Sequence, residues 1–433
     1  MKRLSWIFAG LFLVLLFSEQ SHAIPAFARK YRTSCQTCHN GFPKLTAFGE
    51  AFRRNGYQFP GGTDPEYIKE EPVSLGSEGN KKAFPDAIWP GTLPGSSPIS
   101  LFLNGEVDYN RDDAVGPTRW AFDQLQGSIE AVAAGTLGED LSFWGHAILN
   151  GDGTLELNRM FLIFGNLVGD KYALNLRVGA FEPGLFSFST HRAWMEGYWL
   201  TTRAFSNDMG WTIEEFQKGL EVNGMLQGRF GYSAGVVEGY GGPTADKDFY
   251  GHVTYKWDGL PLDGVTEGGP ALNNPQPYID NSLTLGAFIY HGNANLSAVP
   301  SVDKFTMGGG DFNAYYDRWN LFGGVGLRHD EHPYTDPASL GLGANTTVFF
   351  TELDVVAYPW LLPGVRFESW KSEDADGAGG TASYTDNQIV PGVVFLVRPN
   401  VKFTLRTSFE KDSRWVDSKY ELGQVQFLLA VGI

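Results

Sequence analysis

The chain has 433 residues, a net charge of −16 at pH 7, 14% aromatic residues, 19% charged residues and 54 glycines. The acidic balance argues against nucleic-acid partners, and no stretch beyond the N-terminus offers the twenty uninterrupted apolar residues of a membrane-spanning helix. A glycine content well above the usual ~7%, together with many aromatic residues, is typical of an outer-membrane β-barrel. A soluble β-sandwich or a solenoid is the alternative.

Residues 1–23 predict a secretory signal peptide. Lys2 and Arg3 precede an apolar run over 4–17, and the small-residue stop Ser21-His22-Ala23 follows it. This is the order of a positive region, an apolar region and a cleavage site. The run is too short to span a bilayer, so the mature chain is expected to be exported and to begin at Ile24.

Both cysteines of the chain lie in one run, Cys35-Gln36-Thr37-Cys38-His39. This spacing is the c-type haem attachment signature, in which two thiols bind one haem and the following histidine coordinates its iron. A zinc site would need more thiolates or an organised set of histidines, and a redox dithiol needs a βαβ context. A structural disulfide is the remaining alternative. We expect one haem c on Cys35 and Cys38, with His39 as the proximal iron ligand.

Residues 24–60 are expected to form a small helical, haem-bearing segment, and the Pro-, Gly- and Ser-rich residues 61–98 a connector. Apolar residues at helical spacing predict a helix that starts near Pro43 and ends near Gly56. Such a segment is too small to enclose a haem alone, so the barrel should complete the pocket, with the segment as a plug or cap. Six basic residues against one acidic residue in 24–60 would favour its attraction to an acidic barrel.

Residues 99–433 predict an all-β domain, an antiparallel transmembrane barrel of about sixteen strands. Polar and apolar residues alternate with period two, as expected for strands between lipid and a water-filled lumen. The alternating segments start near residues 99, 122, 141, 155, 172, 217, 229, 248, 282, 304, 319, 346, 364, 386, 401 and 421. Short and long connections alternate between them, except that the long stretch 258–281 falls on the short side. The middle of this map is therefore open to an error of one hairpin.

A sixth iron ligand would have to come from the barrel or its loops, because no histidine or methionine lies between His39 and His146. His146 is the first candidate, since it is in phase with the polar face of its strand. The other candidates lie on polar strand faces or in the long connection 182–215: His252, Met160, His191, Met195 and Met209. A methionine ligand would raise the haem potential, and a second histidine would lower it.

Two external connections have unusual compositions. The connection 182–215 is rich in aromatic residues and long enough to form a constriction or lid, with an aromatic girdle at the membrane interface as the alternative. Glu373, Asp374 and Asp376 lie in a Gly-rich external loop and could concentrate metal cations, although a solvated turn is the simpler interpretation.

The run Ile24-Pro25-Ala26-Phe27-Ala28-Arg29, the C-x-x-C-H motif, Phe42-Pro43-Lys44-Leu45 and Phe48-Gly49 resemble the start of outer-membrane cytochrome–porin fusions of iron-oxidising bacteria. The resemblance covers roughly residues 24–59, and the rest agrees only in length and strand pattern.

The resemblance implies a protein of the bacterial outer membrane, embedded in its lipid, with the haem segment in the periplasm or the barrel lumen. Electrons would pass from extracellular Fe(II) or another reduced metal through the haem to a periplasmic cytochrome or copper protein. Such a protein would act as an outer-membrane iron oxidase. A diffusion porin with an anchoring or gating haem segment, or an outward conduit that reduces extracellular acceptors, are the alternatives.

Overall fold

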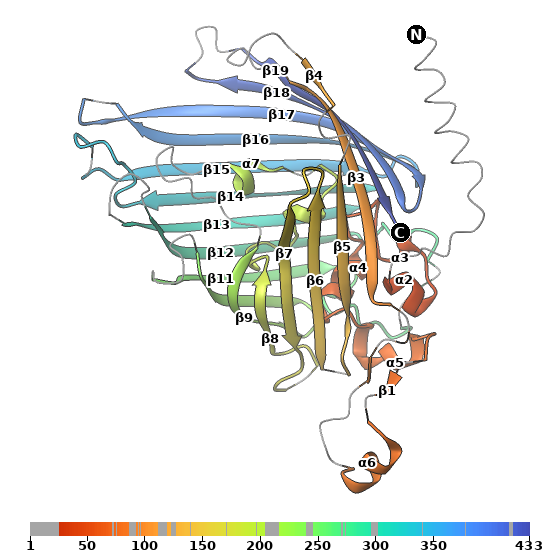
Figure 1. Cartoon of the computed structure of the whole chain (residues 1–433). Coiled ribbons are helices and arrows are strands. Elements are labelled where there is room, and N and C mark those ends of the chain that lie inside the picture. Colours follow the sequence, from red (N-terminus) through yellow and green to blue (C-terminus); the bar gives the residue numbers. More distant parts are fainter. Residues whose placement is uncertain are drawn as a thin grey trace, which may run out of the picture.

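The computed structural model describes residues 26–433, except 72, 75, 86–91, 94, 96, 111–118, 123–126, 139, 170, 196, 204–215, 240–245, 270–271, 273, 296–301, 340, 377 and 415–418. The predicted signal peptide, residues 1–23, lies outside the described residues. A closed antiparallel β-barrel makes up most of the chain, with short helices gathered at one of its ends (Figure 1). None of the helices in the described part of the chain is long and apolar enough to cross a membrane.

The barrel has sixteen strand positions, and β19 closes it by pairing with β3. The strands are β3 Ile99–Asn110, β4 Arg119–Ala121, β5 Ser128–Thr136, β6 Leu141–Asn150, β7 Leu155–Phe164, β8 Asn175–Phe181, β9 Gln217–Leu226, β10 Phe230–Val237, β11 Asp248–Asp258, β12 Ser282–Asn295, β13 Val302–Tyr316, β14 Trp319–Asp330, β15 Ala344–Val355, β16 Leu361–Ala375, β17 Thr381–Arg398, β18 Val401–Asp412 and β19 Glu421–Gly432. Both β4 and β5 pair with β3 and are two pieces of one strand. The prediction of a sixteen-stranded antiparallel barrel is therefore confirmed.

The two ends of the barrel differ in what they carry. We call the end where β3 begins and β19 finishes the proximal end, and the opposite end the distal end. Antiparallel order places the long connection 259–281 at the proximal end, together with short turns such as 227–229. The one-hairpin error left open by the sequence is therefore absent. This connection contacts the N-terminal segment, since Asn55 Nδ2 donates a hydrogen bond to Asp263 O over 2.8 Å.

The N-terminal segment is a set of short helices at the proximal end. They are α2 Ala26–Tyr31, α3 Cys35–Cys38, α4 Ala47–Arg54, the 3₁₀ turn η1 Pro60–Gly62, α5 Asp64–Tyr67 and α6 Glu78–Ala83, with the small strands β1 Val73–Ser74 and β2 Thr92–Leu93 pairing beside α6. The predicted start of the α4 helix at Pro43 is wrong. The helix begins after Thr46, because the Thr46 hydroxyl accepts a hydrogen bond from Gly49 N–H over 3.1 Å and caps it. Its end is close to the prediction, with Gly56 at φ +68° just beyond it.

The described part of the connection between β8 and β9 folds into the lumen instead of lying outside. Residues 182–203, which we call the inward segment, include the 3₁₀ turn η3 Thr190–Arg192 and the helix α7 Trp199–Thr202. Phe188 and Tyr198 of this segment contact Phe350 on β15, with ring centroids 5.9 and 5.1 Å apart. The same apolar core includes Phe52 and Phe59 of the N-terminal helices. The constriction expected from the sequence is therefore present, and the girdle alternative is wrong for the described residues.

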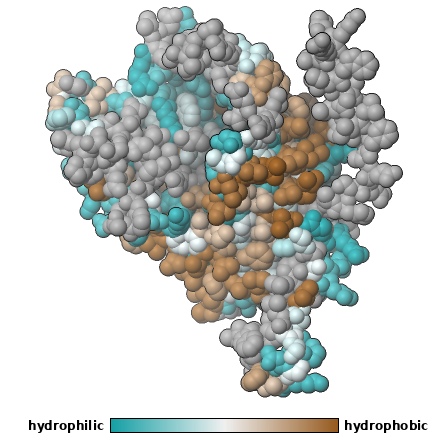
Figure 2. All heavy atoms as spheres, in the orientation of Figure 1, coloured by the Kyte–Doolittle hydropathy of each residue, from teal (hydrophilic) through white to brown (hydrophobic). Residues whose placement is uncertain are grey.

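The outer face of the barrel is apolar. Figure 2 shows hydrophobic residues as a broad band over the strands that face the viewer. Leu101, Leu103, Ile129, Leu155 and Leu157 are among its exposed side chains. Exposed apolar surface costs roughly 25 cal/mol per Å² in water, and a contiguous patch of this kind marks a surface that another apolar phase covers. This is the face a barrel presents to lipid.

Candidate functional site

A large cavity lies between the N-terminal helices and the barrel wall at the proximal end. It contains about 1550 Å³ of empty space, including the part open to solvent. The N-terminal segment lines it with Cys35, Cys38 and His39, and the barrel lines it with residues of β3, β5, β6, β7, β18 and β19. The lining is mostly apolar. Neither part encloses this space alone, which is the shared arrangement that the small size of the segment predicts.

The C-x-x-C-H motif is held in one short helix against α4. Ser34 caps this helix by accepting a hydrogen bond from Gln36 N–H over 3.2 Å, and His39 N–H donates to Cys35 O over 2.9 Å. The Cys38 carbonyl then accepts from Thr46 N–H, also over 2.9 Å. These bonds leave both thiols on the cavity side of a fixed backbone.

The His39 ring is oriented for metal binding through Nε2. Its Nδ1 lies 3.2 Å from Pro43 O, a backbone acceptor that holds the proton on Nδ1. Burial lowers the pKa of His39 to about 4, so the imidazole is neutral at physiological pH. Phe42 contacts this ring and also stacks on Phe102 of β3, with centroids 5.2 and 4.7 Å away. A neutral imidazole with one nitrogen already held is the form in which histidine binds iron.

The environment of the thiols does not suit a redox dithiol. Burial raises the pKa of the Cys35 thiol and raises the pKa of Cys38 to about 12. Reactive cysteines instead have a lowered pKa. The two thiols are not joined as a disulfide. In the described part of the chain no group of three or more His, Cys, Asp or Glu side chains is arranged to hold a metal ion.

Two of the six candidate sixth ligands line the same cavity, His146 on β6 and His191 in the inward segment. His146 Nε2 is 2.9 Å from Glu130 Oε2, and the side chain is almost fully buried. Its Nδ1 is buried and has no hydrogen-bond partner among the described residues. His191 stacks on Phe216 with ring centroids 4.7 Å apart.

Three of the remaining candidates lie away from the cavity. The prediction that Met160 faces the lumen is wrong, because its side chain is exposed on the outer face of the barrel. A register shift in β7 pairs Leu157 with Ala147 but Arg159 with His146, and this extra residue reverses the alternation of the side chains that follow it. His252 faces the lumen as predicted, but its Nε2 pairs with Asp311 Oδ2 over 2.9 Å, away from the cavity. Met195 is buried elsewhere in the lumen. Met209, the fourth, lies outside the described residues.

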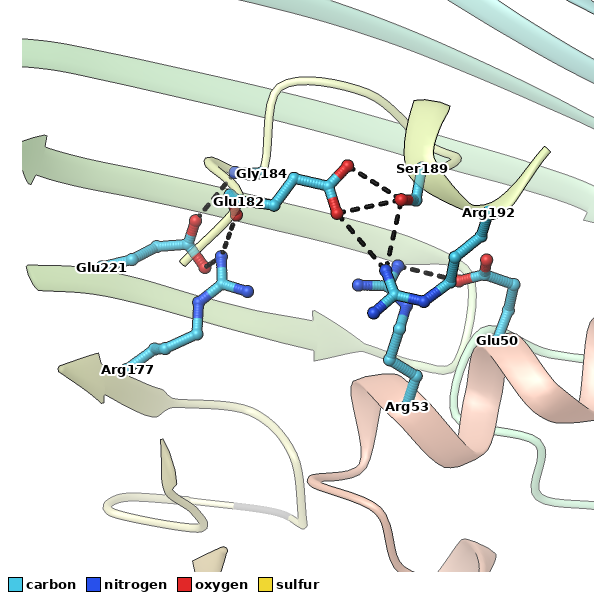
Figure 3. Close-up of polar contacts among 8 residues, drawn as sticks. All are labelled: Glu50, Arg53, Arg177, Glu182, Gly184, Ser189, Arg192 and Glu221. Carbon is cyan, nitrogen blue, oxygen red and sulfur yellow. Dashed lines mark hydrogen bonds and ion pairs between the residues drawn. The ribbon is translucent and has the colours of Figure 1, made fainter. Parts of the chain in front are cut away.

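Charged side chains of α4 and of the inward segment lie close together beside the cavity (Figure 3). Arg53 and Glu50 of α4 form an ion pair at 2.8 Å, and Arg192 pairs with Glu182 at 3.3 Å. Burial opposes ionisation of Glu50, but Arg53 and its cationic neighbours outweigh it and lower the pKa of this carboxyl. Arg53, Arg192 and Arg159 all line the cavity. Their guanidinium groups provide positive charge in a largely apolar space, which sequence patterns alone did not indicate.

The expectation that Glu373, Asp374 and Asp376 all lie in a loop is wrong, because Glu373 and Asp374 belong to the end of β16 and only Asp376 lies in the connection that follows. Asp376 Oδ1 accepts hydrogen bonds from Ala378 N–H and Gly380 N–H over 2.7 and 2.8 Å. Asp374 pairs with Arg414 at 3.6 Å, and Glu373 accepts from Asn345 N–H over 2.8 Å. These contacts favour the solvated turn over a cation site.

Comparison with protein-family models and with curated proteins finds no match. Among solved structures, the chain is similar to an anion-selective porin from Comamonas acidovorans, with a TM-score of 0.54 and 13% identity over 78% of this chain and 98% of the porin. It is also similar to OmpF of Salmonella typhi in complex with daunomycin, with a TM-score of 0.52 and 10% identity over 77% of this chain and 97% of OmpF. The identities are low, so the likeness concerns the fold. The chain has the closed antiparallel barrel of an outer-membrane porin, with the C-x-x-C-H cavity at its proximal end.

Proposed function

We propose that this protein transfers electrons at the outer membrane through a single covalently bound haem c. The observation that carries the proposal is that Cys35, Cys38 and His39 share one largely apolar cavity with two further histidines. Candidate iron ligands, two candidate attachment points and a largely apolar surrounding therefore lie together, which supports a haem redox site.

The residues present fit this group. Cys35 and Cys38 would each add Sγ–H across one vinyl group, forming a thioether C–S bond and leaving the hydrogen on the other vinyl carbon. His39 would bind iron through Nε2, since Pro43 O already holds Nδ1. Arg53, Arg159 and Arg192 would pair with the two propionates by charge-assisted hydrogen bonds. When bound, the haem would supply a one-electron couple.

The electron donor would be extracellular Fe(II) or another reduced metal, and the acceptor a periplasmic cytochrome or copper protein. The proximal end would then face the periplasm, because bacterial barrels keep their short turns on that side. The donor class and the inward direction come from the resemblance of residues 24–59 to the fusions of iron oxidisers. The opposite direction, reduction of extracellular acceptors, uses the same cavity and differs only in potential.

The porin fold also supports a second function, passive diffusion through the barrel. The interior weighs against it, because the inward segment and the N-terminal helices occupy the lumen. Tyr198, Phe350 and Trp370 in this interior are fully buried. A barrel packed in this way would support a redox site better than it would pass solutes.

The test uses the full-length protein extracted from membranes. Mass spectrometry of the peptide with Cys35, Cys38 and His39 should show the added mass of one haem, and the Cys35→Ala/Cys38→Ala variant should lack it. Mixing the oxidised protein with Fe(II) should give a ferrocytochrome spectrum within seconds. A bare polypeptide mass in the wild-type protein would refute the proposal, and a spectrum unchanged by Fe(II) at any pH would exclude iron as the donor.

A further inference from the structure

A carboxylate on the barrel wall holds one histidine ring at the edge of the cavity. Glu130 on β5 faces His146 on β6, with Glu130 Oε2 2.9 Å from His146 Nε2. The other oxygen of Glu130 accepts a hydrogen bond from Asn104 Nδ2 on β3. Glu130 is therefore fixed by both oxygens, and it fixes the orientation of the imidazole in turn.

Nδ1, the second ring nitrogen of His146, makes no hydrogen bond in the described part of the chain. His146 is 7% exposed, and its Nδ1 is buried without a hydrogen-bond partner among the described residues. A buried polar atom without a hydrogen-bond partner destabilises the folded protein. Because the ring lines the cavity that also contains His39, a bond from Nδ1 to a metal ion in that cavity would remove this cost.

We propose that His146 is the second axial ligand of the haem iron and that Glu130 is the residue that positions it. This inference rests on the proposed function. A histidine that binds a metal usually donates its other ring N–H to a carboxylate, which fixes the tautomer and raises the basicity of the ligand. Here Nε2–H donates to Glu130, so Nδ1 carries the lone pair for iron. The resulting pair of histidine ligands gives a low potential compared with a His/Met pair.

The test compares variants of the full-length, haem-loaded protein. Covalent attachment through the two cysteines keeps the haem in place when an axial ligand is lost. The wild-type protein should be six-coordinate and low-spin. His146→Ala should become high-spin, and His146→Met should return to low-spin with a raised potential. His252→Ala is the matched control: it also removes a buried histidine paired with a carboxylate, Asp311, but away from the cavity, so the spin state should not change.

Variants of Glu130 separate positioning from packing. In Glu130→Gln the amide oxygen can still accept the hydrogen bond, so the spectrum should stay low-spin. His146 should then be a less basic ligand and should favour Fe(III) less strongly, so the haem potential should rise. A tenfold weaker preference for Fe(III) over Fe(II) raises the potential by about 59 mV. Glu130→Ala should raise the potential further and populate high-spin haem, because no carboxylate then orients the His146 ring. If Glu130 only fills space, Glu130→Ala should instead keep the wild-type potential.

The outcomes against the proposal are distinct. A low-spin His146→Ala protein that retains its haem, or a five-coordinate wild-type protein, overturns the assignment of His146 and leaves the proposed function intact. Loss of the low-spin state in His191→Ala alone would assign the ligand to His191 instead. A wild-type protein without covalent haem would overturn the proposed function and this inference together.

Discussion

Lys44, in the turn before α4, forms an ion pair with Asp354 on β15, although 310 positions separate them in the sequence. Nζ and Oδ2 are 2.5 Å apart, and the two side chains are 7% and 1% exposed. Lys44 Nζ also lies 4.9 Å from the ring centroid of Trp194, in the inward segment. The Lys44 ammonium group therefore connects the N-terminal segment, the barrel wall and the inward segment.

Removal of Lys44 should loosen the N-terminal segment. Lys44→Met leaves the Asp354 carboxylate buried without its counter-ion, which typically costs about 3–5 kcal/mol. We expect protease cleavage within residues 26–67 of the detergent-solubilised variant while the barrel strands stay protected. Limited proteolysis with mass spectrometry measures this directly.

A matched control and a double variant make this test specific. Lys81 and Glu78 form an exposed pair on α6 at 3.1 Å, and Lys81→Met should change stability by less than about 1 kcal/mol. Lys44→Met/Asp354→Leu removes both buried charges and should recover much of the lost protection. Equal cleavage in the Lys44→Met and Lys81→Met variants would show that the buried pair does not anchor the segment.

Gly49 should not tolerate a methyl group. A Cβ at this position would lie 2.1 Å from the Cys38 carbonyl oxygen, so α4 would have to move away from the C-x-x-C-H motif. Overpacking of this kind typically costs about 1–3 kcal/mol. Gly49→Ala should therefore reduce the ratio of covalent haem to protein. Gly268→Ala, where an added Cβ meets nothing within 4 Å, is the control and should keep the wild-type ratio. Full haem loading in Gly49→Ala would contradict the close packing of α4 on the motif.

The barrel could be predicted from the sequence because period-two alternation follows directly from strand geometry. Ile99 and Leu101 face outward and Ser100 inward, as the alternation requires. Met160 was misplaced because a bulge adds one residue without a change in composition, and every side chain after it reverses its face.

The cavity could be predicted only in part. The C-x-x-C-H motif has a fixed local spacing, so its residues are recognisable in any fold. Arg53, Arg159 and Arg192 come together from α4, β7 and the inward segment, and no local pattern connects them. His146 could be placed in the lumen from the alternation of its strand, whereas the position of His191 at the cavity depends on how the inward segment turns back into the lumen, which is a tertiary property.

The packed lumen predicts very low conductance. Purified wild-type protein in planar lipid bilayers should show no large, long-lived open steps, because aromatic side chains from the inward segment and the N-terminal helices occupy the interior. Replacing residues 185–201 with a short Gly/Ser linker removes one of the two occluding elements and should produce stable openings. Large steady currents from the wild-type protein would instead support the diffusion function.

The thiols of protein made without haem attachment should be slow to alkylate. Cys38, with its pKa raised by burial to about 12, would be ionised in only about one molecule in ten thousand at pH 8, against about one in ten for a thiol near pKa 9. Since the thiolate is the nucleophile, iodoacetamide should modify Cys38 about a thousandfold more slowly than a free peptide of residues 33–41. The rate should rise about tenfold for each pH unit up to pH 11, because the thiolate fraction does so below the pKa. Mass spectrometry of timed samples gives both rates. Alkylation at the rate of the free peptide would mean that the thiols are exposed, and would return redox dithiol chemistry to consideration.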